Sequence, residues 1–387
     1  MTMTDAASPL LATPGAVRAD GVDEGVAAHY GNPNVEQRRL EDGTAVVDLS
    51  HAGVVSVTGP DRLTWLNSIS SQALDRLAPG ESSETLILDP QGRIEYDAHV
   101  FDDGVTTWLL VDRVETAGLF GWLDRMRFTL RVEVADRTEE FATIGTMATD
   151  AASVGLEIAA PNGVPLVWRD PWSEIAVGGW QYASEVEHPA AAWTFSEVLV
   201  PRASLTALAE RAGTGSPVLA GTLALDALRI AAWRPRFSTE VDERSIPHEL
   251  DWMRSAVHLD KGCYRGQETV AKVHNLGHPP RRLVMLHLDG SDTVLPAHGD
   301  EVFAEKKRPE SEAGWRGVGT VTSSAIHHEL GPIALAVIRR GVPVDAQLQV
   351  HTAETGEVVA AAQVVVVPPE AGSTAGIPRM PRLGVRR

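Results

Sequence analysis

The stretch LDKGCYRGQETVAKV, residues 259–273, is the most distinctive part of this sequence. It contains the only cysteine of the chain, Cys263, with Gly262 before it and Gly266 shortly after it. Glycines this close to a thiol allow the backbone to turn sharply and to approach another group closely. Lys261, two residues away, favours the thiolate. A lone cysteine is equally compatible with a small buried hydrophobic side chain, so the stretch alone leaves a functional thiol and a core residue as alternatives.

The composition is that of a globular protein. A chain of 387 residues with 43% hydrophobic and 22% charged residues predicts two or three domains. No segment is apolar enough to span a bilayer, and the first residues lack the features of a signal peptide. With one cysteine no disulfide can form within the chain, so we expect a cytoplasmic protein without membrane contact; we also expect a monomer. The formal charge of −18 argues against a broad nucleic-acid-binding surface.

Long β-rich stretches with few helices predict the α+β class and mainly antiparallel sheets. In residues 84–112, turn sequences at 89–92 and 102–104 separate three strands. From Arg281 onward, strand-like runs separated by Gly, Asp or Pro predict a small antiparallel β-barrel or sandwich. Other strands are expected within 45–59 and at 131–134, 141–145, 165–168, 174–177 and 197–201, and helices at 60–74, 114–127, 203–212 and 222–233. Residues 1–24 and 369–387 have no apolar period and predict a disordered arm and tail.

One predicted strand has an unusual polar face. Alternation places Arg93, Glu95, Asp97 and His99 on the same side of the strand. This face is too polar for an ordinary core, so it is either a solvated outer face or the lining of a ligand site.

Three kinds of site can be considered around the cysteine. A cysteine hydrolase would need a histidine close to Cys263 in space, and His258, His274 and His278 are close only in sequence. A metal site built on the last two is improbable, because Gly277 and the prolines after it prevent a shared helical face. We therefore predict no resident metal, and one cysteine cannot hold an iron–sulfur cluster alone. A transient cluster shared between chains stays open.

Arginines and lysines suggest a third possibility, a cationic pocket for carboxylates. It would need the basic residues near the 222–233 helix and those of the cysteine stretch to converge; otherwise they are ordinary solvated charges. These residues are Arg229, Arg234, Arg236, Lys261, Arg265 and Lys272.

The run KGCYRGQE, residues 261–268, resembles the K-G-C-Y-x-G-Q-E signature of the YgfZ family of folate-binding, iron–sulfur-related proteins. That family is a branch of the glycine-cleavage T-protein (aminomethyltransferase) superfamily. Other segments also resemble the family: VTGPDRLTWLNSISSQAL, LDPQGRIEYDAHVF, DALRIAAWRPRF and the β-rich C-terminal part.

This resemblance implies a three-domain ring with a central site for tetrahydrofolate or a one-carbon derivative. The implied domains are a discontinuous folate-binding core of residues 25–130 plus 213–275, a second α+β domain of 131–212 and a barrel of 276–368. Cys263 matches the essential cysteine of the family, and we place it at the mouth of the folate cleft. The implied folate-site residues are Asp97, Glu197, Arg229, Lys261, Gly262, Tyr264, Gly266, Gln267 and Glu268.

The implied function is assembly or repair of iron–sulfur clusters in client enzymes, including tRNA-modifying ones. Two departures from the T-protein bear on the alternative, a folate-dependent aminomethyl- or methyltransferase. The G-Y-T-G-E motif is replaced by VGGWQYA at 177–183, and a glutamate two residues after Arg229 is replaced by Ala231. Folate recognition needs only a few well-placed polar groups in an apolar cleft. A folate-binding scaffold without catalysis is the third interpretation.

Overall fold

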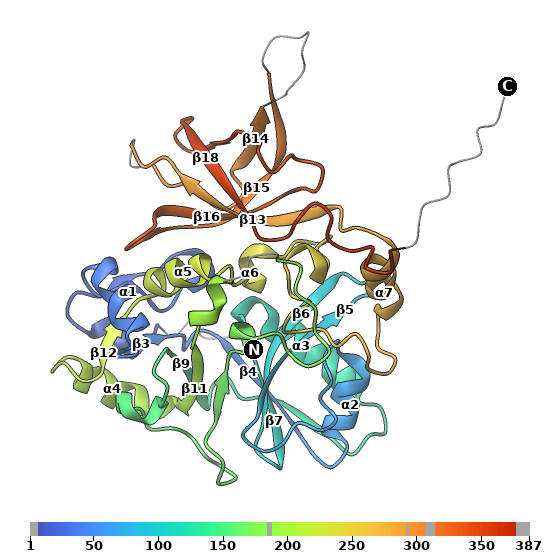
Figure 1. The fold of residues 1–387 in the computed structure, drawn as a ribbon. Helices are drawn as coiled ribbons and strands as arrows, with labels where there is room; N and C mark the ends of the chain where they lie inside the picture. Colours follow the sequence, from blue (N-terminus) through green and yellow to red (C-terminus); the bar gives the residue numbers. More distant parts are fainter. Residues whose placement is uncertain (1–6, 184–187, 292–293, 306–313, 377–387) are drawn as a thin grey trace.

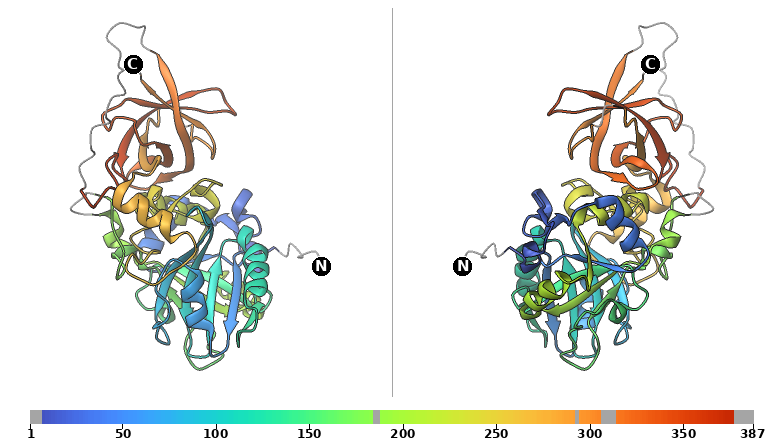
Figure 2. Two further views of the ribbon diagram at one scale, coloured as in Figure 1. Left: turned by 90° about the vertical axis from the view of Figure 1, so that its right-hand side faces the viewer. Right: turned by 90° about the vertical axis from the view of Figure 1, so that its left-hand side faces the viewer.

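The computed structural model describes residues 7–183, 188–291, 294–305 and 314–376. A body of two five-stranded sheets carries a closed six-stranded β-barrel on one side (Figure 1). The two side views agree that the barrel, built from the last third of the chain, sits on the body as a separate layer (Figure 2). The predicted α+β class with mainly antiparallel sheets and a C-terminal barrel is confirmed.

The first sheet of the body is fully antiparallel, and its strand order is β5-β6-β7-β4-β8. Its apolar side chains pack against the helices α2 and α3 in one buried cluster. The capping box of Asp112 and Glu115 begins α3. The bounds are β4 Gly53–Thr58, α2 Arg62–Ile69, β5 Ser82–Leu88, β6 Ile94–Asp102, β7 Thr106–Val111, α3 Arg113–Met126 and β8 Glu133–Asp136.

The second sheet has the order β10-β11-β9-β3-β12, and only its β12–β3 pair is parallel. Helix α4 packs on its apolar face, and α5 begins directly after the edge strand β12. The bounds are α1 Pro33–Glu41, β3 Ala45–Asp48, β9 Phe141–Thr146, β10 Val167–Arg169, β11 Ser196–Pro201, α4 Leu205–Ala212, β12 Val218–Ala220 and α5 Thr222–Ala231.

The sheets cut across the predicted division at residues 130 and 212. Strand β8 follows residue 130 but pairs with β4 in the first sheet. Strands β3 and β12, both expected in the discontinuous core domain, belong to the second sheet. Strand pairing therefore joins the two predicted body domains more closely than the linear sequence indicates.

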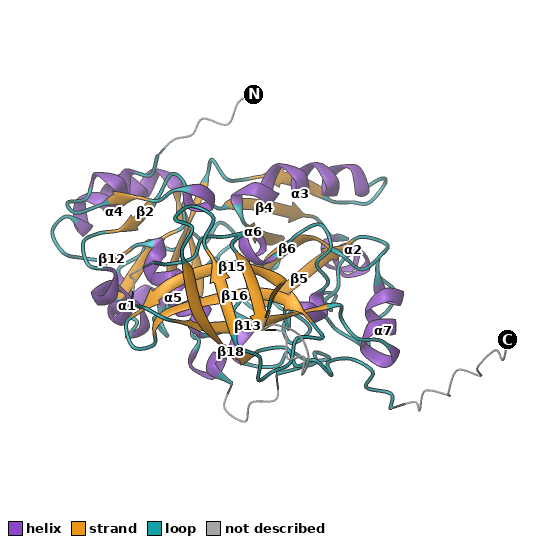
Figure 3. Cartoon of the chain, turned by 90° about the horizontal axis from the view of Figure 1, so that it is seen from above, coloured by secondary structure: helices purple, strands orange, loops and turns teal. Residues whose placement is uncertain are grey.

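The barrel closes through pairing of its first and last strands, β13 and β18. Viewed from above, it lies over the centre of the body (Figure 3). Ser323 of β15 accepts a hydrogen bond from Arg229 of α5, and Gln37 of α1 donates to the carbonyl of Ile326. The bounds are β13 Arg281–Leu288, β14 Glu301–Glu305, β15 Trp315–His327, β16 Gly331–Arg339, β17 Leu348–His351 and β18 Val358–Val365.

Both predicted disordered ends are wrong where the structure describes them. Residues 7–24 contain two short 3-10 helices and the strand β1 (Val17–Arg18), which pairs with β2 (Ala27–His29). Leu10 is fully buried and the body covers Asp23, because an apolar anchor and an ion pair outweigh the low-complexity composition. At the other end Ala371 is buried, and residues 1–6 and 377–387 lie outside the described residues.

Two further segments complete the body. The predicted strand at 174–177 is wrong: these residues lie between a short 3-10 helix and a turn, and they bond to the 253–259 loop instead of a sheet. After the short helix α6 (Phe237–Glu240), helix α7 (Gln267–Leu276) contains His274 but ends before His278, as the glycine at 277 predicts. Within the described ranges, no helix is long and apolar enough to cross a membrane.

Candidate functional site

A cavity lies in the body where the two sheets approach each other beneath α5. The cavity opens to solvent, and its lining comes from both sheets, from α5 and from the residues that follow α5. Its walls combine apolar side chains with an unusual number of charged ones. The charged lining residues are Asp23, Asp97, Asp112, Glu115, Asp170, Glu197, Asp226, Arg229, Arg234 and Arg236, together with His51 and His99.

Asp97, on β6, is the carboxyl group of this cavity with the least hydrogen bonding. Its side chain is almost entirely buried, and its Oδ1 has no hydrogen-bond partner among the described residues. Burial, and then the charge of Glu84, raise the pKa of Asp97 well above its usual range. The backbone N–H of Asp97 donates to Glu115, which holds the strand against the start of α3. A buried oxygen without a hydrogen-bond partner lowers the stability of the fold unless a ligand donates a hydrogen bond to it.

His99, two residues along the same strand, connects Asp97 to the second sheet. Its Nδ1 lies 2.9 Å from Oε2 of Glu197 on β11, and its Nε2 lies 3.8 Å from Oδ2 of Asp97. The ring stacks on Trp168 with a centroid separation of 3.8 Å and an interplanar angle of 1°. Burial opposes a charge on this imidazole, but the Glu197 carboxylate overcomes it and raises the pKa of His99 to about 9.

Arg234 provides the fixed positive charge behind this pair. Its guanidinium lies 2.7 Å from Oε1 of Glu84 and 2.9 Å from Oδ2 of Asp170, and its Nη2 is 3.4 Å from Nε2 of His99. Ligand atoms of Glu84, Asp97 and His99 lie within 4.8 Å of one another, which is close enough for a metal ion. Arg234 already supplies a cation to this cluster, so the donor set favours an ion-pair network over a metal centre.

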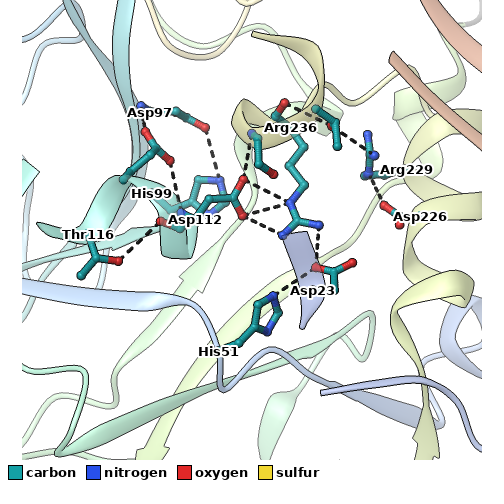
Figure 4. Close-up of polar contacts among 12 residues, drawn as sticks. Asp23, His51, Asp97, His99, Asp112, Thr116, Asp226, Arg229 and Arg236 are labelled. Atoms are coloured by element: carbon teal, nitrogen blue, oxygen red, sulfur yellow. Dashed lines mark hydrogen bonds and ion pairs between the residues drawn. The ribbon is translucent and has the colours of Figure 1, made fainter. Parts of the chain in front are cut away.

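A second network closes the cavity from the N-terminal side (Figure 4). Arg236 binds Asp112 at 2.8–3.1 Å and Asp23 at 2.8 Å, and His51 lies 3.0 Å from the same Asp23 oxygen. Burial opposes ionisation of Asp112, but Arg236 lowers the pKa of this carboxyl to about 2. Asp23 belongs to the segment expected to be disordered, so the N-terminal residues contribute a wall of the site.

Arg229 lines the cavity, but its guanidinium is bound to other groups of the protein. Its guanidinium binds Asp226 at 2.6 Å, Glu240 at 3.0 Å and Ser323 at 2.8 Å. It therefore ties α5 to α6 and to the barrel. All three arginines of the cavity have carboxylate partners, and the remaining basic residues of the predicted cationic pocket lie elsewhere, so that pocket does not form.

The cysteine stretch lies away from the cavity, because none of its residues is among those that line it. It packs instead against the β5–β6 turn, where the carbonyl of Gly266 approaches Gly92. Arg265 forms an ion pair with Glu95 at 2.6 Å, next to this turn. Cys263 therefore does not line this cavity, and its place at the mouth of the folate cleft stays a prediction.

Lys261 has a structural role in this stretch. Its ammonium donates to the carbonyls of Asn67, Ser70 and Gln72 at 2.6–2.7 Å, and so caps the C-terminal end of α2. All three of its protons are used there, so it is not free to hold a thiolate. Burial lowers the pKa of Lys261 to about 8.

The other residues of the signature divide into a structural and an exposed set. Tyr264 is buried, and the Gln267 side chain donates to the carbonyl of Lys261. Gly266 has φ +84°, and a Cβ there would lie 2.6 Å from the carbonyl oxygen of Asp89. The exposed residues are Gly262, Cys263 and Glu268.

Sequence reasoning therefore located part of the cavity and missed the rest. Asp97, Glu197 and Arg229 do line it, and two residues of the polar β6 face, Asp97 and His99, face the cavity. The missed lining residues are Asp23, His51, Asp112, Glu115, Asp170 and Asp226, and Glu84, which pairs with Arg234 behind the lining, was also missed. A charge inside an apolar run was the only available signal for Glu84 (E-T-L-I-L), and nothing marked Asp23 within the arm.

Comparisons with known proteins agree with this architecture. Residues 26–158 match the GCVT N-terminal domain, and residues 281–369 match the glycine cleavage T-protein C-terminal barrel domain. The glycine cleavage system aminomethyltransferase T of Bartonella henselae has a similar fold, with a TM-score of 0.67 at 17% identity over 92% of this chain and 94% of that structure.

Two curated relatives illustrate the range of similarity. An aminomethyltransferase of Herpetosiphon aurantiacus is 24% identical over 341 residues, 86% of this chain and 90% of that protein. A protein of Arabidopsis thaliana, named a candidate chloroplastic transferase, is 25% identical over 277 residues. That alignment covers 69% of this chain and 61% of the Arabidopsis protein. The two matches lie in the order N-terminal domain and then barrel, so the chain carries these two domains of the glycine cleavage T-protein superfamily.

Proposed function

We propose that this protein binds tetrahydrofolate or a one-carbon derivative in the cavity and takes part in one-carbon transfer there. The observation that carries the proposal is Asp97, a buried carboxyl group with an unpartnered oxygen at the wall of the cavity. The superfamily and the relatives named as aminomethyltransferases support a folate-dependent reaction. No residue of the cysteine stretch lines this cavity.

The cavity has suitable groups for a reduced folate. Leu110, Val111, Trp193 and Phe195 provide apolar walls for a pterin ring. Asp97 and Glu197 offer carboxyl oxygens that accept hydrogen bonds from the N–H groups of a pterin. Arg229 does not hold the ligand in this proposal, since its donors are bound to neighbouring protein groups.

Tetrahydrofolate supplies amine nitrogens that accept a one-carbon unit. With a protonated N-methylated amine as donor, the carbon–nitrogen bond of the donor breaks and its electron pair leaves with the amine as the folate nitrogen bonds to the carbon. The folate nitrogen then releases its proton, and the free Oδ1 of Asp97 is the acceptor in this proposal. A carboxyl with a raised pKa is a stronger base when ionised than an exposed aspartate. The apolar walls strengthen this effect because they exclude water.

The test combines binding and turnover. Tetrahydrofolate binding is measured by calorimetry, and one-carbon folate products are measured after incubation with an N-methylated amine donor. We expect Asp97→Asn to bind folate within a few-fold of the wild type but to lose at least about 100-fold in turnover, as for a general base. Asp124→Asn, on the exposed side of α3, is the matched control and should behave as wild type. Binding without turnover in the wild type would contradict the transfer reaction and favour a folate-binding scaffold.

A second function, maintenance of iron–sulfur clusters in client enzymes such as tRNA-modifying ones, is favoured by the Cys263 segment. We propose it because the thiol is exposed and the K-G-C-Y-x-G-Q-E signature is complete. Gly262 has open space at its Cβ position and no positive φ, so the backbone itself does not require a glycine there. We expect a Cys263→Ala strain to lose client activity under oxidative stress while folate binding is kept. Full client activity in that strain would exclude this function.

A further inference from the structure

His99 occupies a position that the proposed reaction does not yet use. It lies between the two carboxyl groups proposed to face the folate, Glu197 at 2.9 Å and Asp97 at 3.8 Å. The imidazole is held from a third side by the ring of Trp168, which stacks parallel to it and donates its own N–H to the carbonyl of Ser83. Its orientation is therefore determined by two strands, β10 and β11, that belong to the opposite sheet.

We propose that His99 is a positioning residue that keeps a positive charge beside Asp97 and so determines when Asp97 is ionised. The inference rests on the proposed role of Asp97 as proton acceptor. Its physical basis is proximity: an opposite charge about 4 Å from a buried carboxyl favours the ionised form.

The charged groups around His99 are arranged to retain its proton. Glu197 faces it from β11, Asp97 from its own strand and Glu84 from β5. Only Arg234, 3.4 Å away, opposes the charge, and Arg234 is itself paired with Glu84 and Asp170. Four carboxyl groups therefore surround one imidazole and one guanidinium.

The same contacts make Asp97 sensitive to His99. Burial, Glu84 and Asp112 favour the neutral acid, whereas His99 and Arg234 favour the carboxylate. Arg234 is fixed in charge, so His99 is the only member on the favourable side whose proton can be lost. Loss of its charge should leave Asp97 protonated at pH values where the wild type is ionised, and a protonated Asp97 cannot accept the folate proton.

The test follows the Asp97 carboxyl directly by NMR of ¹³C-aspartate-labelled, ligand-free protein, with Asp97→Asn to assign the signal. In His99→Gln, which can still hydrogen-bond to Glu197, we expect the Asp97 titration to move to higher pH. His99→Lys keeps a positive charge and should restore a titration near that of the wild type. Glu197→Gln leaves His99 in place but weakens its charge, so a smaller shift in the same direction is expected. His287→Gln, in the barrel strand β13, is the matched control and should change nothing.

An unchanged Asp97 titration in His99→Gln would overturn the proposal, and so would equal shifts in His99→Gln and His99→Lys, because both would mean that packing and not charge matters. The titration needs no folate, so its outcome is independent of whether the protein transfers one-carbon units. If transfer occurs, the rising limb of its pH–rate profile should move to higher pH in His99→Gln by the same amount as the Asp97 titration.

Discussion

The cavity and the cysteine stretch are the two regions that the sequence singles out, and they are built in opposite ways. The cavity collects buried charges from both sheets, α5 and the N-terminal segment, which are far apart in the sequence. The cysteine stretch is continuous, and its thiol is exposed. In the cavity, partners from distant parts of the sequence determine the chemistry of each group. In the cysteine stretch, most signature residues stabilise the conformation of their own loop.

This difference teaches that a short signature can be mostly structural. Lys261 caps α2, Tyr264 is buried and Gly266 fits a turn that excludes a side chain. Gly262, Cys263 and Glu268 are the exposed positions of the signature, and Arg265 is half-buried. A complete match to the signature is therefore evidence for one loop conformation as much as for one activity.

The largest effect is expected from breaking the cavity network at Arg229. Arg229→Met leaves Glu240 and Asp226 without their common cation, and Glu240 is entirely buried, so we expect a loss of about 3–5 kcal/mol in the free energy of unfolding. Urea denaturation measures it. Arg211→Met, on the exposed face of α4, is the control and should cost less than about 0.5 kcal/mol. Equal stabilities for the two variants would mean that the network does not hold the barrel to the body.

The contribution of the cavity residue His99 to the free energy of unfolding should depend on pH. Folding raises the pKa of His99 from 6.5 to about 9, so the folded protein holds this proton more tightly than the unfolded chain. Its contribution is fully present below about pH 6.5 and is lost as the pH rises towards 9; it amounts to about 3 kcal/mol at most. The measurement is the difference in unfolding free energy between wild type and His99→Gln at several pH values. A difference that does not change between pH 6 and pH 9.5 would contradict it.

Within the cysteine stretch, the two glycines should behave differently. Gly266→Ala places a Cβ 2.6 Å from the carbonyl oxygen of Asp89 at positive φ, so we expect a loss of about 1–3 kcal/mol. Gly262→Ala, where the space is open, should stay within about 0.5 kcal/mol and serves as the internal control. Thermal unfolding of both variants checks this. A destabilised Gly262→Ala would show that its backbone is as constrained as that of Gly266.

The smallest effect is expected at Cys263 itself. Cys263→Ser should change the unfolding free energy by less than about 0.5 kcal/mol and folate affinity by less than about twofold, because the thiol is exposed and lies outside the cavity. A thiol reagent should label the native wild-type protein completely without unfolding it. A strong loss of folate affinity in this variant would connect the two regions that the structure separates.

Much of the fold was predictable, because it depends on local patterns. The three strands of residues 84–112, the helices α3 and α5 and the barrel strands follow from alternation, helical spacing and turn residues. The prediction of a strand at 174–177 was wrong because the N–H of Ala176 donates to the carbonyl of Arg254 in a loop and not to a neighbouring strand. The prediction of a disordered N-terminal arm was wrong because composition does not reveal that Leu10 and Asp23 have partners in the body.

The sequence by itself determined the fold class, the C-terminal barrel, the polar face of β6 and the resemblance carried by residues 261–268. Only the tertiary structure decided which charges meet. Alternation placed Asp97 and His99 on one face, but their chemistry depends on Glu197, Trp168 and Arg234, which other strands and loops bring within 4 Å. Burial and Coulomb interactions act through space at such distances, and no spacing along the chain encodes them.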